Sequence, residues 1–374
     1  MKKILSAFLS SAIMLFSVST TVSADYKSEE ASYTITSASK ATEFYKSVMK
    51  NPEWSATNRK ERGEKLQLPE KWLENMTTSA LIDAVVEYPF FSDVYFFDDV
   101  KIGAEVLYDT FNEVRELADR PDVATVLLQK YKDENVLIDV NTSDDIFRLT
   151  DMEILFSLDF VKEKLTDDEI SELSNVVFDK YNKKNKSEIY GEFSANMFYD
   201  LIGVDTNSKN LVASTEAAMS YDDTVYTPNG TPVSVIVDQP KLSMREAYDL
   251  NVQAALLYPN AERLREPTNK YNCHSYAWYS QSSSNNKWMN NPSAYISDGS
   301  YYVSGNPQSN YKMIYLYGTR IDHSAIIETR LSGISNINFR DMVIVKSKWG
   351  QAGLYRHNGN DSPYYYCDTV SYYN

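Results

Sequence analysis

The sequence predicts an α+β protein in which an all-helical N-terminal domain is followed by a smaller domain of mixed helices and strands. Three observations predict this arrangement. Apolar residues between positions 39 and 204 recur at helical spacing, with almost no strand-like alternation. Short β-branched runs bounded by turn residues begin after residue 205. The net charge also changes sign between the two parts. We therefore predict an acidic helical domain over residues 25–204, a connecting segment over 205–250 and a second domain over 251–374.

The first 24 residues have the three parts of a secretory signal peptide. Lys2 and Lys3 give a charged start, an apolar run extends from Ile4 to Phe16, and Ala24 ends a small-residue cleavage site. An uncleaved membrane anchor is the alternative, but serines interrupt the apolar run, which is shorter than the roughly 20 residues of a spanning helix. We therefore expect an exported protein with no membrane span after signal cleavage.

The charge of the chain is negative overall and unevenly distributed. The net charge is −15, to which residues 1–24 contribute +2 and residues 251–374 contribute +3, from 11 Lys and Arg against 8 Asp and Glu. Residues 25–250 therefore carry −20. Nucleic-acid binding needs a dense basic face, so we expect no nucleic acid as a partner. We expect the carboxylates of the helical part to lie on solvated helix faces, because the sequence has no calcium loop with alternating carboxylates and a central glycine.

The helical domain is predicted from apolar spacing and from helix start and stop signals. Prolines at positions 89 and 121 end two of the helices. Thr166 and Glu169 form a capping box that opens another. The aromatic cluster within residues 88–97 is expected to be core, with a docking surface as the alternative. The predicted helices span residues 41–49, 78–88, 99–118, 123–131 and 143–164, followed by the capped helix that starts after Thr166.

The second part of the chain begins with a turn and a β-branched strand. The turn surrounds Asn229-Gly230, and the strand covers residues 233–237. Ser243 and Glu246 form a second capping box, which opens a helix through Leu257. A helix bearing a cysteine, followed by several strands, predicts an α+β domain here. The clearest later strands are expected over residues 313–317, 324–329 and 342–345.

A cysteine and a histidine in this second part form a candidate catalytic pair. Cys273 is one of only two cysteines and starts a short run with helical spacing. A thiol there lies near the positive end of a helix dipole, which lowers its pKa. Such a nucleophile needs a general base, and His323 lies at the mouth of a predicted strand. His274 should point to a different helix face. His357 is either a third member of the site or a surface histidine.

Two short motifs around this pair resemble a known family. The segment 272–278 (Asn-Cys-His-Ser-Tyr-Ala-Trp) resembles the cysteine motif of the CHAP amidohydrolase/peptidase family. The segment 323–328 (His-Ser-Ala-Ile-Ile-Glu) is similar to the histidine-bearing strand of that family and of the NlpC-type cell-wall endopeptidases. The resemblance covers roughly residues 265–355. It implies a papain-like fold, with the cysteine at a helix N-terminus and the histidine on an antiparallel sheet. It also implies hydrolysis of amide bonds in peptides, typically in peptidoglycan, by a secreted or cell-wall-associated enzyme.

The third catalytic residue departs from the family pattern. These enzymes usually place a Glu or Asn on the next strand, whereas the matching segment 345–350 carries lysines. Lysine cannot accept a hydrogen bond from an imidazole N–H. Ser347 is therefore our expected orienting residue, and Asn336, Asn338 or a backbone carbonyl are the alternatives.

Cysteine catalysis also requires groups that bind the oxyanion formed during the reaction. Two other functions remain possible for the same residues. The backbone N–H of Cys273, together with Asn272 or Tyr271, is expected to hold the oxyanion. No metal or cofactor is expected, because two Cys and three His at these spacings form no zinc pattern. One alternative is a non-catalytic interaction protein with a disulfide between Cys273 and Cys367. The other is acyl transfer of the transglutaminase type by the same Cys-His pair.

Overall fold

The computed structural model describes residues 36–139, 141–142, 144–202, 221–331, 340 and 342–374. Helices and antiparallel strands both occur in this part of the chain, so the prediction of an α+β protein is confirmed. The predicted signal peptide over residues 1–24 lies outside the described residues, as do residues 205–220 of the predicted connecting segment.

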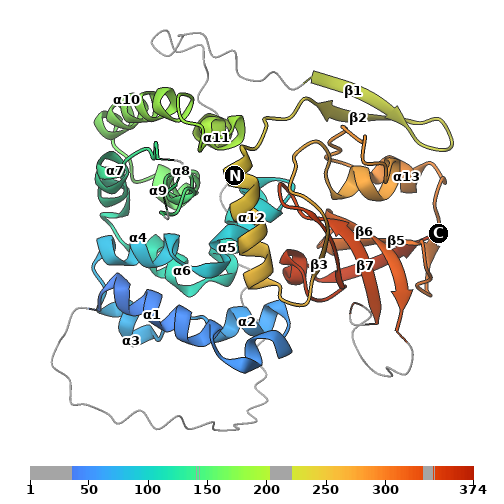
Figure 1. The fold of residues 1–374 in the computed structure, drawn as a ribbon, viewed down its shortest axis with the longest axis horizontal. Helices are drawn as coiled ribbons and strands as arrows, with labels where there is room; N and C mark the ends of the chain where they lie inside the picture. Colours follow the sequence, from blue (N-terminus) through green and yellow to red (C-terminus); the bar gives the residue numbers. More distant parts are fainter. Residues whose placement is uncertain (1–35, 140, 143, 203–220, 332–339, 341) are drawn as a thin grey trace, which may run out of the picture. The chain divides into compact units, whose positions relative to one another are not determined.

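The first half of the described chain is helical (Figure 1). Short connections join successive helices, and two 3-10 helices, η1 (Pro52–Ala56) and η2 (Pro89–Phe96), occur within the series. The α-helices are α1 (Ala38–Met49), α2 (Arg59–Lys65), α3 (Glu70–Glu74), α4 (Thr78–Val86), α5 (Val100–Thr110), α6 (Asn112–Asp119), α7 (Val123–Asp133), α8 (Arg148–Phe156), α9 (Asp159–Lys162), α10 (Asp167–Lys184) and α11 (Glu192–Ile202).

Helix starts follow the capping signals of the sequence. The capping boxes at Thr166 and at Ser243 are both formed, so both predictions are confirmed. The second one opens α12 (Met244–Leu257), which ends where the sequence predicts. The single helix predicted over residues 99–118 is wrong. Phe111 has an extended backbone and separates α5 from α6, because its ring is fully buried and stacks on Tyr88 at 3.5 Å between centroids.

A seven-stranded antiparallel sheet dominates the second half, in the order β3-β8-β7-β6-β5-β9-β4. β5, β6 and β7 contain the predicted strands 313–317, 324–329 and most of 342–345. A separate hairpin pairs β1 with β2, and its turn holds Gly230 at a φ of +86°, which glycine adopts at little cost. The strands are β1 (Tyr221–Tyr226), β2 (Pro232–Val237), β3 (Glu262–Arg265), β4 (Val303–Ser304), β5 (Lys312–Tyr317), β6 (Arg320–Arg330), β7 (Val343–Lys348), β8 (Leu354–Asn358) and β9 (Thr369–Tyr373).

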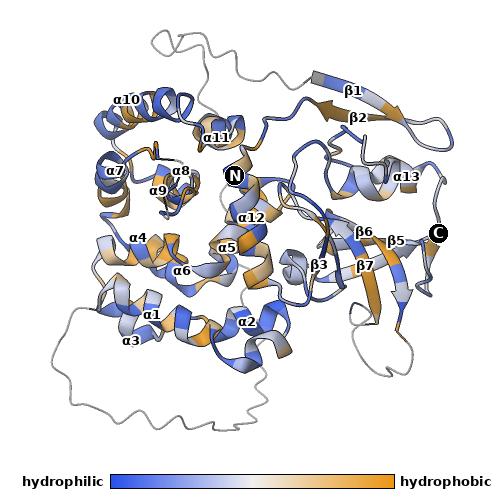
Figure 2. Cartoon of the chain, viewed as in Figure 1, coloured by the Kyte–Doolittle hydropathy of each residue, from blue (hydrophilic) through white to orange (hydrophobic). Residues whose placement is uncertain are grey.

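The central strands of this sheet are buried on both faces. Successive side chains of a strand point to opposite faces. Tyr315 and Ala325 belong to a large core that continues into the helices, whereas Ile314 and Ile326 belong to a smaller cluster that contains Trp278. Figure 2 shows hydrophobic residues along β7. On the side of the smaller cluster lies the short π-helix η3 (Ser275–Tyr279), which contacts β6 and β7, and α13 (Ser293–Ser297) contributes to the same cluster. A last 3-10 turn, η4 (Pro363–Tyr366), precedes β9.

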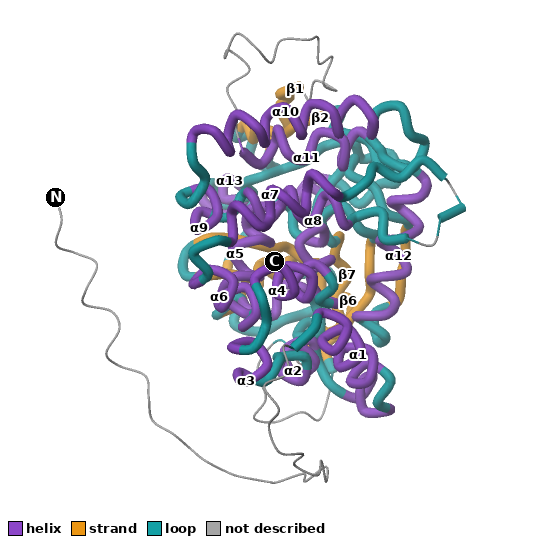
Figure 3. Tube along the Cα trace, turned by 90° about the vertical axis from the view of Figure 1, so that its left-hand side faces the viewer, coloured by secondary structure: helices purple, strands orange, loops and turns teal. Residues whose placement is uncertain are grey.

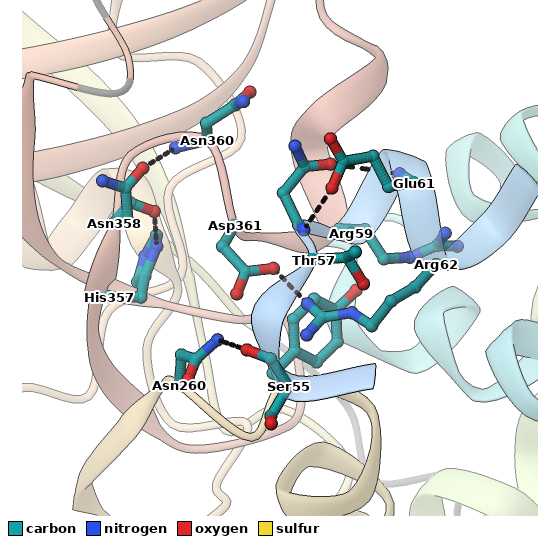
Figure 4. A network of polar contacts seen from close by, with 12 residues as sticks. Ser55, Thr57, Arg59, Glu61, Arg62, Asn260, His357, Asn358, Asn360 and Asp361 are labelled. Carbon is teal, nitrogen blue, oxygen red and sulfur yellow. Dashed lines mark hydrogen bonds and ion pairs between the residues drawn. The ribbon is translucent and has the colours of Figure 1, made fainter. Parts of the chain in front are cut away.

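Polar contacts join the helical half to the sheet half. Arg62 of α2 forms a buried ion pair with Asp361, which follows β8 (Figure 4). Close by, the Asn260 side chain donates a hydrogen bond of 2.7 Å to the Ser55 carbonyl. Viewed from the helical side, the helices lie in front of the strands (Figure 3). Hydrogen bonds from Tyr364 and Gln351 hold η2 against the second half of the chain, and this contact builds the candidate site.

Candidate active site

Cys273 begins the helical turn that leads into η3, as the sequence predicts. The preceding residue, Asn272, caps this turn, because its side-chain oxygen accepts from the Ser275 N–H at 3.1 Å. The same oxygen accepts from the Met289 N–H at 3.1 Å, and the amide nitrogen donates to the Met289 carbonyl at 2.7 Å. Asn272 is thus a rigid support. Cys273 is fully buried behind it.

The partner of the Cys273 thiol comes from the helical half. Its Sγ donates a hydrogen bond of 2.9 Å to Oδ2 of Asp98, which lies between η2 and α5. The Asn272 amide donates to the same carboxylate oxygen at 2.9 Å. In addition, the backbone N–H of Ser324 in β6 points at Sγ, at 3.4 Å. The thiol therefore contacts one carboxylate and one backbone donor.

Contacts of the three residues that precede Asp98 hold its segment in position. The Tyr364 hydroxyl donates to the Phe96 carbonyl at 3.0 Å, and the Gln351 N–H donates to the Tyr95 carbonyl at 3.0 Å. The Phe97 ring packs on Tyr364 with 4.9 Å between centroids. The aromatic run that the sequence assigned to the core is buried as expected, and it also delivers Asp98 to the thiol. Sequence reasoning missed Asp98, since 175 residues separate it from Cys273 and it belongs to no motif.

His274 belongs to the same cluster. Its Nδ1 is 2.8 Å from the Ser324 hydroxyl oxygen, which also accepts from the Trp278 indole N–H at 2.9 Å. Its Nε2 lies 3.8 Å from Oδ2 of Asp98. A ligand-type atom from each of Asp98, Cys273 and His274 lies within 4.8 Å of the other two. The expectation that His274 would point away from Cys273 is therefore wrong, because the Ser324 contact turns its ring toward Asp98.

The ionisation of these groups follows from their burial. Desolvation raises the pKa of Asp98 to about 7, against the opposing effect of its hydrogen bonds from Cys273 and Asn272. Burial, together with the Asp98 carboxylate, raises the pKa of the Cys273 thiol well above its usual value. Burial lowers the pKa of His274 to about 3 and that of the neighbouring Lys348 to about 7. The resting thiol is thus protonated, in contrast to the expected helix-dipole effect.

His323 lies on β6, but its ring is not hydrogen-bonded to Cys273. The ring stacks on Tyr364 with 3.8 Å between centroids and a 14° angle between the planes. Neither ring nitrogen has a hydrogen-bond partner among the residues that the structure describes. Burial holds the pKa of His323 well below its usual value. Because neighbouring strand residues face opposite sides, the side chain of Ser324 meets His274 while His323 faces the other core.

Ser347 and Tyr271, two other expected site residues, have different partners. The Ser347 hydroxyl is 2.8 Å from Nε2 of His357 and accepts from the Trp349 indole N–H at 3.0 Å. The hydroxyl of Tyr271 accepts a long hydrogen bond of 3.4 Å from Arg265. No hydrogen bond joins Ser347 to His323 in the described structure. The alternative orienting residues at positions 336 and 338 lie outside the described residues.

A surface pocket of about 450 Å³ adjoins the cluster. Asp98 and His274 line it together with Trp288, Asp322 and Gln351, whereas Cys273 does not. Both Cys273 and Cys367 are free thiols, so the disulfide of the non-catalytic alternative is not formed. The pocket therefore leads to the carboxylate and the imidazole, and the thiol lies beneath them.

Comparison with protein-family models, curated proteins and solved structures finds no match for this chain. Within the described residues, no helix combines the length and the apolar character needed to cross a bilayer. The chemistry of the site therefore has to be argued from its own residues.

Proposed function

We propose that this protein is an exported cysteine hydrolase that cleaves amide bonds in bacterial cell-wall peptides, with Cys273 as the nucleophile. The observation that carries the proposal is the 2.9 Å hydrogen bond from the thiol to Asp98 beside a surface pocket. A nucleophile joined to a proton acceptor is the basic requirement of covalent catalysis. A cysteine-bearing turn packed on an antiparallel sheet also supports the papain-like arrangement implied by the motifs.

In the proposed reaction Asp98 carries the proton. The Sγ proton moves to the Asp98 carboxylate as the sulfur attacks the carbonyl carbon of the amide. The protonated carboxyl then gives this proton to the departing nitrogen, which leaves as an amine, and a thioester to Cys273 remains. Water attacks the thioester while Asp98 accepts its proton. The acid product leaves, and the returned proton restores the thiol.

Two neighbours of Sγ favour the thiolate during this cycle. The Ser324 N–H donates to the sulfur, and a hydrogen bond to a charged acceptor is stronger than one to a neutral acceptor. The Lys348 amine lies nearby and is held by the carbonyls of Gly350 and Ala352 at 2.5 and 2.6 Å. When protonated, it offsets part of the negative charge of the thiolate.

Substrate access requires a local rearrangement. Cys273 is fully buried, and the pocket is lined by Asp98 and His274 instead. A peptide bound in the pocket therefore has to displace one of these side chains before its carbonyl meets Sγ.

The proposal is tested by incubating the full-length protein with purified peptidoglycan and measuring the release of new amino groups. We expect Cys273→Ala to abolish the release and Asp98→Asn to lower kcat roughly 100-fold or more. Cys367→Ser is the matched control, since it removes the other free thiol, and it should retain activity. Equal release by the wild type and by Cys273→Ala would overturn the proposed function.

A further inference from the structure

We infer that a divalent ion of the zinc class binds between Cys273, Asp98 and His274. The side chains of these residues are a thiol, a carboxylate and an imidazole, the three ligand types that zinc takes in proteins. In the described part of the chain they form the one group of this kind whose ligand atoms all lie within 4.8 Å of one another. A spacing rule applied to the sequence cannot find this group, because Asp98 is remote from the other two residues.

The distances suit a tetrahedral ion. Zinc–ligand bonds of about 2.0–2.3 Å place two ligand atoms roughly 3.5 Å apart. The observed separations are 2.9 Å from Sγ to Oδ2 of Asp98 and 3.8 Å from Nε2 of His274 to the same oxygen. The third separation, from Sγ to the His274 nitrogen, lies within 4.8 Å, so shifts of about 1 Å convert the resting hydrogen-bonded cluster into a coordination site.

Neighbouring side chains form hydrogen bonds to the candidate ligands His274 and Asp98, as the residues around the ligands of known metal sites do. Nδ1 of His274 contacts the Ser324 hydroxyl at 2.8 Å, so Nε2 is the nitrogen directed at Asp98. The Trp278 indole N–H fixes that hydroxyl at 2.9 Å. The Asn272 amide donates to Asp98 at 2.9 Å. Such partners fix ligand orientation and typically contribute 10–100-fold to metal affinity.

An orphaned oxygen provides independent support for an ion. Oδ1 of Asp98 is buried and has no hydrogen-bond partner among the described residues. The Asp98 side chain is only 12% exposed, so this oxygen is poorly solvated. Leaving a buried acceptor unpaired is costly. A cation bound by both oxygens of the Asp98 carboxylate would satisfy it, and the charges of one thiolate and one carboxylate would balance a divalent ion.

Metal binding is also compatible with access to the site. A peptide cannot reach the buried sulfur in the resting structure, whereas a small ion can enter through the pocket lined by Asp98 and His274. Binding would release the thiol proton to solvent and form a sulfur–metal bond. If Cys273 is the nucleophile proposed above, this ion engages its sulfur and inhibits hydrolysis. That regulatory role rests on the proposed function, but binding itself does not.

The test uses Co²⁺ as the probe, added to chelator-treated full-length protein. We expect one equivalent to bind with a thiolate-to-cobalt charge-transfer band in the near ultraviolet. Cys273→Ser should abolish the band, and Asp98→Asn and His274→Asn should each weaken binding about 10-fold or more. Cys367→Ser should keep the band and the affinity. Circular dichroism of every variant shows whether it has kept its fold.

Two outcomes overturn the inference. One is the absence of a charge-transfer band at one equivalent of Co²⁺ with folded wild-type protein. The other is a band that survives Cys273→Ser at unchanged affinity. Failure of the metal site and failure of the hydrolase are distinguishable. Chelated protein that hydrolyses peptidoglycan but binds no Co²⁺ refutes only the site. Protein that binds Co²⁺ through Cys273 but never hydrolyses refutes only the function.

Discussion

At the scale of single residues, the main question is which side chain accepts the proton of the Cys273 thiol. The sequence motif assigns this role to His323, whereas the structure joins the thiol to Asp98. We expect Asp98→Asn to reduce kcat far more than His323→Gln. An amide still accepts the hydrogen bond but cannot take up the proton, whereas His323 has no polar partner among the described residues that it could lose. Steady-state kinetics on the folded variants measures both. An equal or larger loss in His323→Gln would restore the histidine as the base.

A second prediction at this scale concerns Glu113, which is buried in the helical half. Desolvation raises its pKa to about 8, although Oε1 accepts from the Tyr45 hydroxyl and from the Leu68 N–H, each at 3.0 Å. The folded state therefore binds this proton more tightly than the unfolded chain. The resulting stabilisation is complete below the unfolded pKa of 4.5 and is lost as pH rises through about 8.

Glu113→Gln removes this titration while keeping the acceptor oxygen. Between pH 4 and pH 9 the wild type should lose a few kcal/mol of unfolding free energy relative to the variant. The size follows from about 1.4 kcal/mol for each unit by which the Glu113 pKa is raised. Urea unfolding across this range provides the measurement. Parallel stability curves for the two proteins would contradict the prediction, and changes at other titrating groups cancel in the comparison.

At the scale of elements, the capping box of α10 gives a local prediction. Thr166→Ala removes the oxygen that accepts from the Glu169 N–H, and we expect it to lower the unfolding free energy by about 1 kcal/mol. Ser174→Ala is the matched control, because Ser174 lies inside the same helix and its hydroxyl donates to the Ile170 carbonyl. That substitution should be neutral or slightly stabilising. Thermal unfolding of both variants decides the point, and similar losses would argue against a capping effect.

Some boundaries of the helices and strands can be predicted from the sequence, and others cannot. Capping boxes and strand runs depend on neighbouring residues, so the starts of α10 and α12 and the central strands were predictable. The break at Phe111 was not, because contact with Tyr88 overrides local helical spacing. The same holds for the site. Cys273 was visible in its motif, but Asp98 meets it only through the packing of η2 on the sheet, a relation between distant segments.

At the scale of the whole molecule, the shared core implies cooperative unfolding. One continuous hydrophobic core includes helix residues such as Leu81 and sheet residues such as Tyr315, and the buried Arg62–Asp361 pair bridges the two halves. We expect far-ultraviolet circular dichroism and tryptophan fluorescence to report a single transition. Arg62→Met should lower the unfolding free energy by about 3–5 kcal/mol, because it leaves the Asp361 charge buried. Two separated transitions in the wild type would contradict a shared cooperative core.

The origin of Asp98 in the helical half has a consequence for how the protein is made. During synthesis the carboxylate leaves the ribosome 175 residues before the cysteine. At 5–20 residues per second, roughly 10–35 s pass between the synthesis of Asp98 and that of Cys273. Asp98 meets the thiol only after Gln351 and Tyr364, which hold the segment before Asp98, have also been added. The contact between Asp98 and Cys273 therefore forms late, once nearly all of the chain has been made.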